Sequence, residues 1–217
     1  PVVAIWGAGF KGRAYGLDEI LELVRFLKDD PDCGGNLVML GVPYGWREQE
    51  RDAVGDELFQ EVVAAADIIS PWTVGRFSSA EAMAEHQAVM EADLAWLGAR
   101  GKSYLPVAFP GFGWQNLERA IGREAELNAI PRLGGRFLWS QAAAARSAGA
   151  KMLYVAMFDE MNESTAIFKC TNNPPVGPSA FMTYEGLPSD HYLWLTGEIG
   201  RLMRDEIEGA SGMPKRR

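Results

Sequence analysis

The sequence predicts an α/β protein with a parallel β-sheet, and two observations support this fold class. Five short apolar runs are spaced along the chain, at residues 2–6, 37–42, 67–71, 103–109 and 151–158. The runs are continuous rather than alternating, as in strands that helices cover on both faces. Each run is followed by loop residues and then by a helical pattern, and this order is typical of βα units.

The expected helices follow the strands in order. They cover residues 18–28, 52–66, 80–99, 137–147 and 190–208. Five such units fit either an open, doubly wound sheet or part of a (β/α)8 barrel. They are too few to close a barrel alone, because a complete one typically takes about 250 residues.

Composition excludes several classes of protein. The chain has 217 residues, of which 47% are hydrophobic and 23% charged, so it can bury a core and is not expected to be disordered. Its net charge of −8 argues against nucleic acid and anionic membranes as partners. No apolar run approaches the length of a membrane span. Cys33, Cys170, His86 and His191 lie at no metal-ligand spacing, so we expect neither a metal nor a cofactor.

Aromatic and polar residues follow the predicted strands where each strand ends. In a parallel α/β protein these points share one rim, where binding sites are built. Flat, amphipathic rings suit the C–H faces of sugars. The alternative is that some of these residues only cap the rim as ordinary apolar packing. The candidates for substrate binding are Trp6, Tyr44, Trp46, Trp72, Arg76, Phe112 and Trp114.

An acidic segment follows the most apolar predicted strand. Asp159, Glu160 and Glu163 place three carboxylates within five residues, with Asn162 between them. Repulsion and partial burial of such a group raise at least one pKa. A protonated and an ionised carboxylate side by side are what glycoside hydrolysis requires. The alternatives are a solvated acidic loop or N-terminal charges on a short helix. Glu160 and Glu163 are therefore the catalytic candidates, and Asp159 and Asn162 are candidates for substrate binding.

A glycine-rich segment offers a different function. Gly7, Gly9 and Gly12 form a G-x-G-x-x-G pattern directly after the first strand, as in NAD(P)-binding oxidoreductases. In that fold a helix begins inside the motif and an acidic residue ends the second strand. Here Tyr15 and Gly16 interrupt the helix, and the second strand ends without a carboxylate. A plain loop is the favoured interpretation, and nucleotide binding remains the alternative.

Several segments together resemble the endo-α-mannosidase-like glycoside hydrolases of families 71 and 99, and especially bacterial relatives labelled xylosidase or arabinosidase. The segments are 41–46, 67–77, 105–112, 154–165 and 185–194, and they fall in family order over nearly the whole chain. The resemblance implies a (β/α)8 TIM barrel of which this chain supplies about the last five units. Residues 1–217 would then form one partial barrel domain without its N-terminal strands. We expect an exported or periplasmic protein, with this chain inactive by itself.

The resemblance also assigns roles to the two glutamates. The family motif Asn-Glu-Trp-His-Glu-Gly-Thr corresponds to residues 159–165 here. In the family the first glutamate assists the sugar's own 2-hydroxyl in displacing the aglycone, and the second is the general acid and base; these roles fall on Glu160 and Glu163. Met161 and Asn162 replace the Trp and His, and Phe112 replaces a tyrosine. These changes leave a carbohydrate-binding barrel without catalysis as an alternative to a glycosidase.

Overall fold

The computed structural model describes residues 1–174, 177–207 and 212–216, apart from the side chains of residues 80 and 81. The chain forms two compact units, which are described separately. The first comprises Pro1–Thr73 and Ala88–Pro106, and the second comprises Val74–Gln87 and Val107–Arg217. The two segments of each unit meet in space although they are separated in the sequence.

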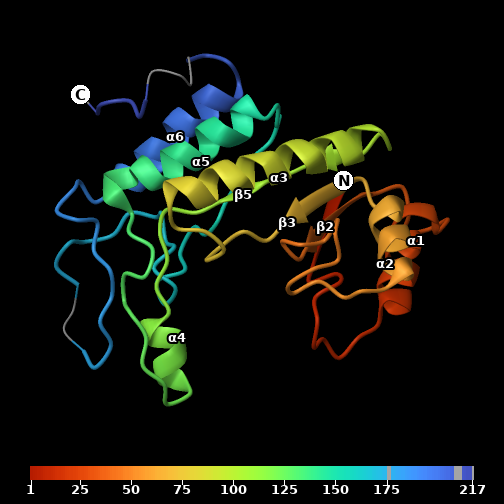
Figure 1. Cartoon of the computed structure of the whole chain (residues 1–217), viewed down its shortest axis with the longest axis horizontal. Helices are drawn as coiled ribbons and strands as arrows, with labels where there is room; N and C mark the ends of the chain where they lie inside the picture. Colours follow the sequence, from red (N-terminus) through yellow and green to blue (C-terminus); the bar gives the residue numbers. More distant parts are fainter. Residues whose placement is uncertain (175–176, 208–211, 217) are drawn as a thin grey trace. The chain divides into compact units, whose positions relative to one another are not determined.

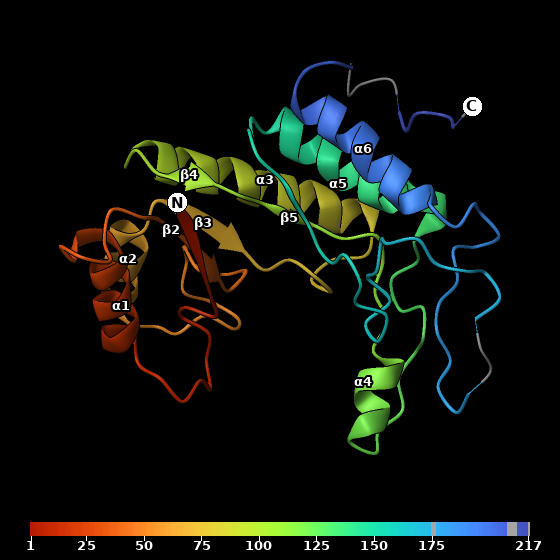
Figure 2. The ribbon, with the colours of Figure 1, turned by 180° about the vertical axis from the view of Figure 1, so that it is seen from behind.

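The first unit contains a four-stranded parallel sheet in the order β1-β2-β3-β4 (Figure 1). The strands are β1 (Val2–Trp6), β2 (Leu37–Val42), β3 (Ile68–Pro71) and β4 (Ser103–Tyr104). Helices α1 (Leu17–Asp29) and α2 (Glu57–Ala65) lie side by side next to these strands in both views (Figures 1 and 2). In the register of the sheet, Trp6 lies beside Gly41 and Val42 beside Pro71.

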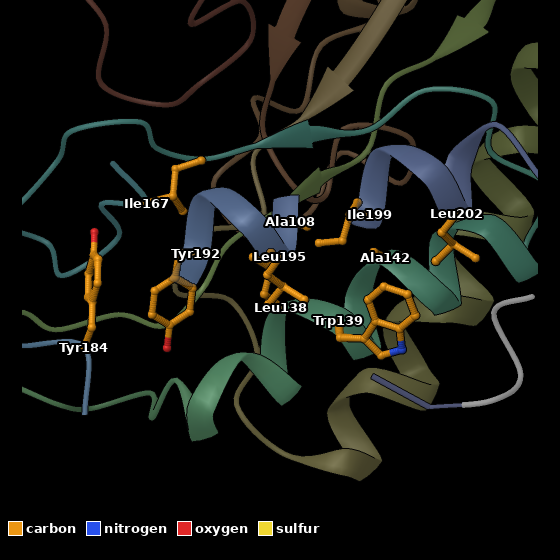
Figure 3. Close-up of a cluster of buried hydrophobic side chains, with 10 residues drawn as sticks. All are labelled: Ala108, Leu138, Trp139, Ala142, Ile167, Tyr184, Tyr192, Leu195, Ile199 and Leu202. Atoms are coloured by element: carbon orange, nitrogen blue, oxygen red, sulfur yellow. The ribbon is translucent and has the colours of Figure 1, made fainter. Parts of the chain in front are cut away.

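The second unit contains two short parallel strands, β5 (Val107–Ala108) and β6 (Tyr154–Val155). Its helices are α4 (Gln115–Ala120), the 3-10 turn Leu133–Gly135, α5 (Arg136–Ser147) and α6 (His191–Met203). Figure 3 shows its core, where α5 and α6 pack together through Leu138, Trp139, Leu195 and Ile199. The long helix α3 (Ala80–Gly98) contributes its first turns to this unit and the rest to the first.

The predicted α/β class with parallel strands is confirmed. Strands β1 and β2 have the predicted bounds, and β3 begins one residue later than expected. Helices α1, α3 and α5 each begin and end within one residue of the prediction. Closure into a barrel and a single domain over residues 1–217 stay predictions. None of the described helices is long and apolar enough to cross a lipid bilayer.

Two strand predictions were wrong in extent. The run 103–109 forms two strands, because β4 ends at Tyr104 and β5 starts at Val107. Pro106 lies in this break, and proline has no N–H to donate to a ladder. The run 151–158 was expected to be a strand throughout, but only Tyr154 and Val155 pair with β5. An apolar run therefore marked the place of each strand without fixing its length.

The helix predictions also need correction. Helix α2 begins at Glu57 rather than at residue 52, because Asp56 is its N-cap and accepts a hydrogen bond from the Leu58 amide at 2.9 Å. Helix α4 was not predicted, since it has no buried residue and therefore no apolar stripe. Helix α6 ends at Met203, five residues before the predicted end, and residue 208 lies outside the described residues.

A buried carboxylate organises the first unit. Asp93 of α3 is 1% exposed and accepts hydrogen bonds from Trp46 Nε1 at 3.1 Å and Arg47 Nε at 2.9 Å. Burial raises the pKa of the Asp93 carboxyl to about 6, although both hydrogen bonds act in the opposite direction. Asp93 thus fixes the loop after β2 by holding two consecutive residues of it.

The raised pKa of Asp93 makes stability depend on pH. The pKa of Asp93 in the folded protein lies above its ordinary value. Its contribution to the free energy of unfolding is therefore complete at about pH 4 and is lost as the pH rises through about 6. The amide that Asp93→Asn introduces would not titrate. We expect the unfolding free energy of this variant, relative to wild type, to rise by about 2 kcal/mol between about pH 4 and about pH 7. Urea unfolding at both pH values measures this, with the exposed Asp29→Asn as the control. A pH-independent difference would contradict it.

Candidate functional site

The acidic segment lies directly after β6, at its carboxyl end. Asp159 and Asn162 are exposed, whereas Glu160 and Glu163 are partly buried. The segment folds back on itself, because the Thr165 amide donates to the Glu160 carbonyl at 3.1 Å and the Asn162 amide donates to Glu160 Oε1 at 2.9 Å. The structure therefore brings the two glutamates together on one tight loop.

The electrostatics of this loop distinguish Glu163. Burial raises the pKa of its carboxyl, and the negative charge of Glu160 raises it further. A carboxyl group with a raised pKa keeps its proton to higher pH and can donate it to a leaving group. The neighbouring Glu160 supplies a second carboxylate. The pair therefore has the composition that acid-assisted cleavage requires.

The loop after β5 lies against the acidic loop. The Gly113 amide donates to the Glu163 carbonyl at 2.9 Å. A Cβ at position 113 would come within 1.9 Å of the Leu127 carbonyl oxygen, so only glycine fits this close approach. Parallel pairing of β5 with β6 explains the contact, because it places both carboxyl ends at the same edge.

Aromatic residues flank the acidic loop in the second unit. Phe112 and Trp114 form an edge-to-face pair with ring centroids 4.5 Å apart. A Cβ on Gly75 would lie 3.5 Å from the Phe112 ring and 3.6 Å from the Trp114 ring, so the loop carrying Arg76 runs beside them. Trp114 is 43% exposed and Arg76 is exposed. Both side chains can therefore meet a ligand from solvent.

The first unit carries a second aromatic group at the carboxyl ends of its strands. Trp6 and Trp72 pack edge to face with ring centroids 5.1 Å apart. A Cβ at Gly41 would lie 2.1 Å from the Trp6 ring, so the missing side chain lets the indole lie across β2. Trp6 is 40% exposed and Trp72 is partly exposed. The partly buried Tyr44 stacks with Arg51, whose guanidinium carbon lies 5.0 Å from its ring centroid.

Two of the predicted sugar contacts are placed differently. Trp46 is fully buried, donates to Asp93 and packs edge to face on Trp96. Phe112 is 3% exposed. Neither ring offers a face to solvent, because each fills the interior of its own unit. Sequence reasoning grouped them with the exposed aromatics because position after a strand does not report burial.

The glycine-rich segment behaves as a loop. The amides of Gly7 and Ala8 donate to the Gly41 carbonyl, and the Lys11 amide donates to the Asp52 carbonyl. Helix α1 begins only at Leu17, after the pattern has ended. These amides are thus engaged within the protein rather than directed at a pyrophosphate. The arrangement favours the plain-loop interpretation over nucleotide binding.

Two buried polar residues, one in each unit, were missed. Arg132 donates to the carbonyls of Ser164 and Ala166, directly after Glu163. Its sequence context, Ile-Pro-Arg-Leu-Gly-Gly, carries no helix, strand or motif signal. Asp93 had a signal, since it shares a helix face with Met90 and Leu97, and a carboxylate within an apolar stripe is unusual.

Two hollows are relevant to the assignment. One of about 120 Å³ in the first unit is lined by Tyr44, Arg47 and Asp93 among others. Another hollow of about 1040 Å³ in the second unit lies among helices α3, α5 and α6, and neither Glu160 nor Glu163 lines it. We place the site at the strand ends because reactive groups of parallel α/β proteins gather there. Among the described residues, no group of three or more His, Cys, Asp or Glu could hold a metal ion.

No protein-family model and no curated protein matches this chain. Solved structures do match. Two structures of the GH99 endo-α-mannosidase from Bacteroides thetaiotaomicron share 17% sequence identity with it. The first match has a TM-score of 0.61 and covers 86% of this chain and 54% of the Bacteroides chain. The second has a TM-score of 0.59 and covers 94% of this chain and 66% of the Bacteroides chain. The chain therefore has an endo-α-mannosidase-like fold that spans about half to two thirds of the length of those proteins.

Proposed function

We propose that this chain carries the catalytic groups of a glycoside hydrolase that cleaves an oligosaccharide or polysaccharide. The main support for this proposal is the loop after β6, where the partly buried Glu163 with its raised pKa lies beside Glu160. The fold supports the proposal, since proteins of this fold include an endo-α-mannosidase. The sequence adds the matching order of the two glutamates in residues 159–165.

The proposed mechanism divides the work between the two carboxyl groups. Glu163 is the general acid: its proton passes to the glycosidic oxygen as the bond to the sugar breaks, so that the leaving group departs as an alcohol. Glu160 accepts a proton from the group that attacks the anomeric carbon, either the sugar's own 2-hydroxyl or a water molecule. Where the 2-hydroxyl attacks, the ionised Glu163 then takes a proton from the water that opens the resulting 1,2-anhydro sugar, and Glu160 returns its proton to O2, so both groups are restored. Where water attacks directly, the product forms in that step, and the two carboxyl groups regain their starting protonation by exchange with solvent.

Exposed and partly exposed residues at the strand ends of each unit are the proposed sugar contacts. Trp114, Arg76, Asp159 and Asn162 lie on loops of the second unit, and Trp6, Tyr44 and Trp72 lie at the strand ends of the first. Exposed indoles give apolar area to sugar faces, and the polar side chains can bind hydroxyl groups. Trp46 and Phe112 are left out of this set because they are buried.

The role of Glu163 predicts a selective loss of turnover. Glu163→Gln keeps the size of the side chain but has no acidic proton, so kcat/KM should fall by at least about 100-fold while polysaccharide binding is retained. The assay uses aryl glycosides of mannose, xylose and arabinose and plant polysaccharides, in the intact protein. Glu124→Gln, an exposed change, is the control and should keep full activity. Equal activity in both variants would remove Glu163 from the mechanism. Binding without sugar release in the wild type would favour a non-catalytic carbohydrate-binding barrel.

The pKa of Glu163 should respond to its neighbour. Because the Glu160 charge raises the pKa of Glu163, Glu160→Gln should lower it. Carbon-13 NMR of the labelled carboxyl groups measures this titration directly and needs no turnover. In the wild type, activity should fall as the pH rises through the pKa of Glu163, since the acid then loses its proton. An unchanged Glu163 titration in the variant would show that the two carboxylates do not interact.

A further inference from the structure

Arg132 is a buried cation of the second unit without an acidic partner. It is 2% exposed, and among the described residues no carboxylate pairs with it. Its Nε and Nη1 atoms are buried and have no hydrogen-bond partner there. Burying an arginine in this way is costly unless strong compensating interactions exist. The burial of Arg132 must therefore be compensated by other interactions.

The compensating interactions come from aromatic faces and backbone carbonyls. The guanidinium carbon lies 4.5 Å from the ring centroid of Tyr192 and 5.1 Å from that of Tyr184. A desolvated cation over an aromatic face is stabilised by the ring quadrupole. Nη2 donates to Ser164 O and to Ala166 O, both at 2.8 Å. Charge-assisted bonds of this kind are stronger than neutral ones.

These two carbonyls belong to the chain that leaves Glu163. The same loop is fixed before this point by the Gly113 amide on the Glu163 carbonyl and by the Thr165 amide on the Glu160 carbonyl. Ser164 has a φ of +60°, a left-handed conformation that few side chains adopt without support. Arg132 holds the carbonyls on both sides of Thr165 and so fixes the end of this turn.

Tyr184 and Tyr192 connect Arg132 to the core of the second unit. Figure 3 shows Tyr184 next to Tyr192, and both belong with Ile167 and Leu195 to the cluster that joins α5 to α6. The Tyr184 hydroxyl donates to Phe168 O and lies 3.3 Å from Ala166 O, the same oxygen that Arg132 binds. The support for the acidic loop therefore continues from the loop carbonyls through Arg132 into α6.

We propose that Arg132 is a positioning residue that fixes Glu163 in its reactive arrangement by clamping the carbonyls of Ser164 and Ala166. The inference rests on the proposed glycosidase function and extends it. Arg132 binds the loop through backbone carbonyls, so it acts through geometry and not as an acid or base. A displacement of about 1 Å at a reacting group can lower a rate about 100-fold.

A comparison of leaving groups separates positioning from simple loss of folded protein. A methyl glycoside needs a proton from the acid to depart, whereas a 2,4-dinitrophenyl glycoside does not. In Arg132→Met the rate on methyl glycosides of mannose, xylose or arabinose should fall about 10- to 100-fold more than the rate on the dinitrophenyl glycoside of the same sugar. KM should change little. Arg132→Lys should recover part of the loss, and the exposed Arg136→Met should behave as wild type.

Hydrogen exchange of the intact protein gives a second readout without turnover. Amides of residues 159–166 should exchange faster in Arg132→Met, whereas those of α5 should not. Tyr184→Phe, which keeps the ring and loses only the hydroxyl, should produce a smaller change in the same segment. It serves as the second variant if Arg132→Met does not fold.

The possible outcomes are distinct. Equal loss on both leaving groups, or unchanged exchange of residues 159–166, would overturn the positioning role. If the wild type releases sugar from no probe, the proposed function fails, and the exchange result alone decides whether Arg132 fixes the loop. A larger loss on the methyl glycoside, together with faster exchange confined to residues 159–166, would establish the positioning role of Arg132.

Discussion

Parallel pairing of β5 with β6 is the constraint on which the candidate site depends. Two adjacent strands that run the same way end at the same edge, so the loops that follow them meet. That geometry brings the Gly113 amide to the Glu163 carbonyl. The pairing itself covers only two residues on each strand. The hydrogen bond from the Gly113 amide to the Glu163 carbonyl adds to this short ladder in holding the two loops together.

The sequence predicted the class of fold and the place of most elements, because apolar runs and helical stripes report which segments are buried. It failed where another physical effect decides. Pro106 divides a run that is uniformly apolar, and Asp56 sets the start of α2 through a cap rather than through hydrophobicity. Helix α4 buries nothing and so leaves no pattern. Length and boundary depend on single hydrogen bonds, which periodicity does not record.

The candidate site was predictable in part for the same reason. Glu160 and Glu163 stand out because charges directly after an apolar strand are uncommon, and their closeness follows from their spacing. Trp46 looked equivalent to Trp6, but one ring is buried against Asp93 and the other is 40% exposed. Arg132 gave no signal in the sequence, since its hydrogen-bond acceptors are carbonyl groups that every residue possesses. The residues that support a site from behind are therefore the hardest to predict from the sequence.

The turn that carries the glutamates is held by its main chain. The bonds at Met161 and Asn162 are made by a backbone carbonyl, which accepts from the Ser164 amide, and by a backbone amide, which donates to Glu160. Side chains at these two positions can change without removing either bond. The placement of the two carboxylates is thus separable from the side chains at positions 161 and 162. Under the proposed glycosidase function, these are the natural positions for a library that changes sugar recognition and keeps the carboxylates in place.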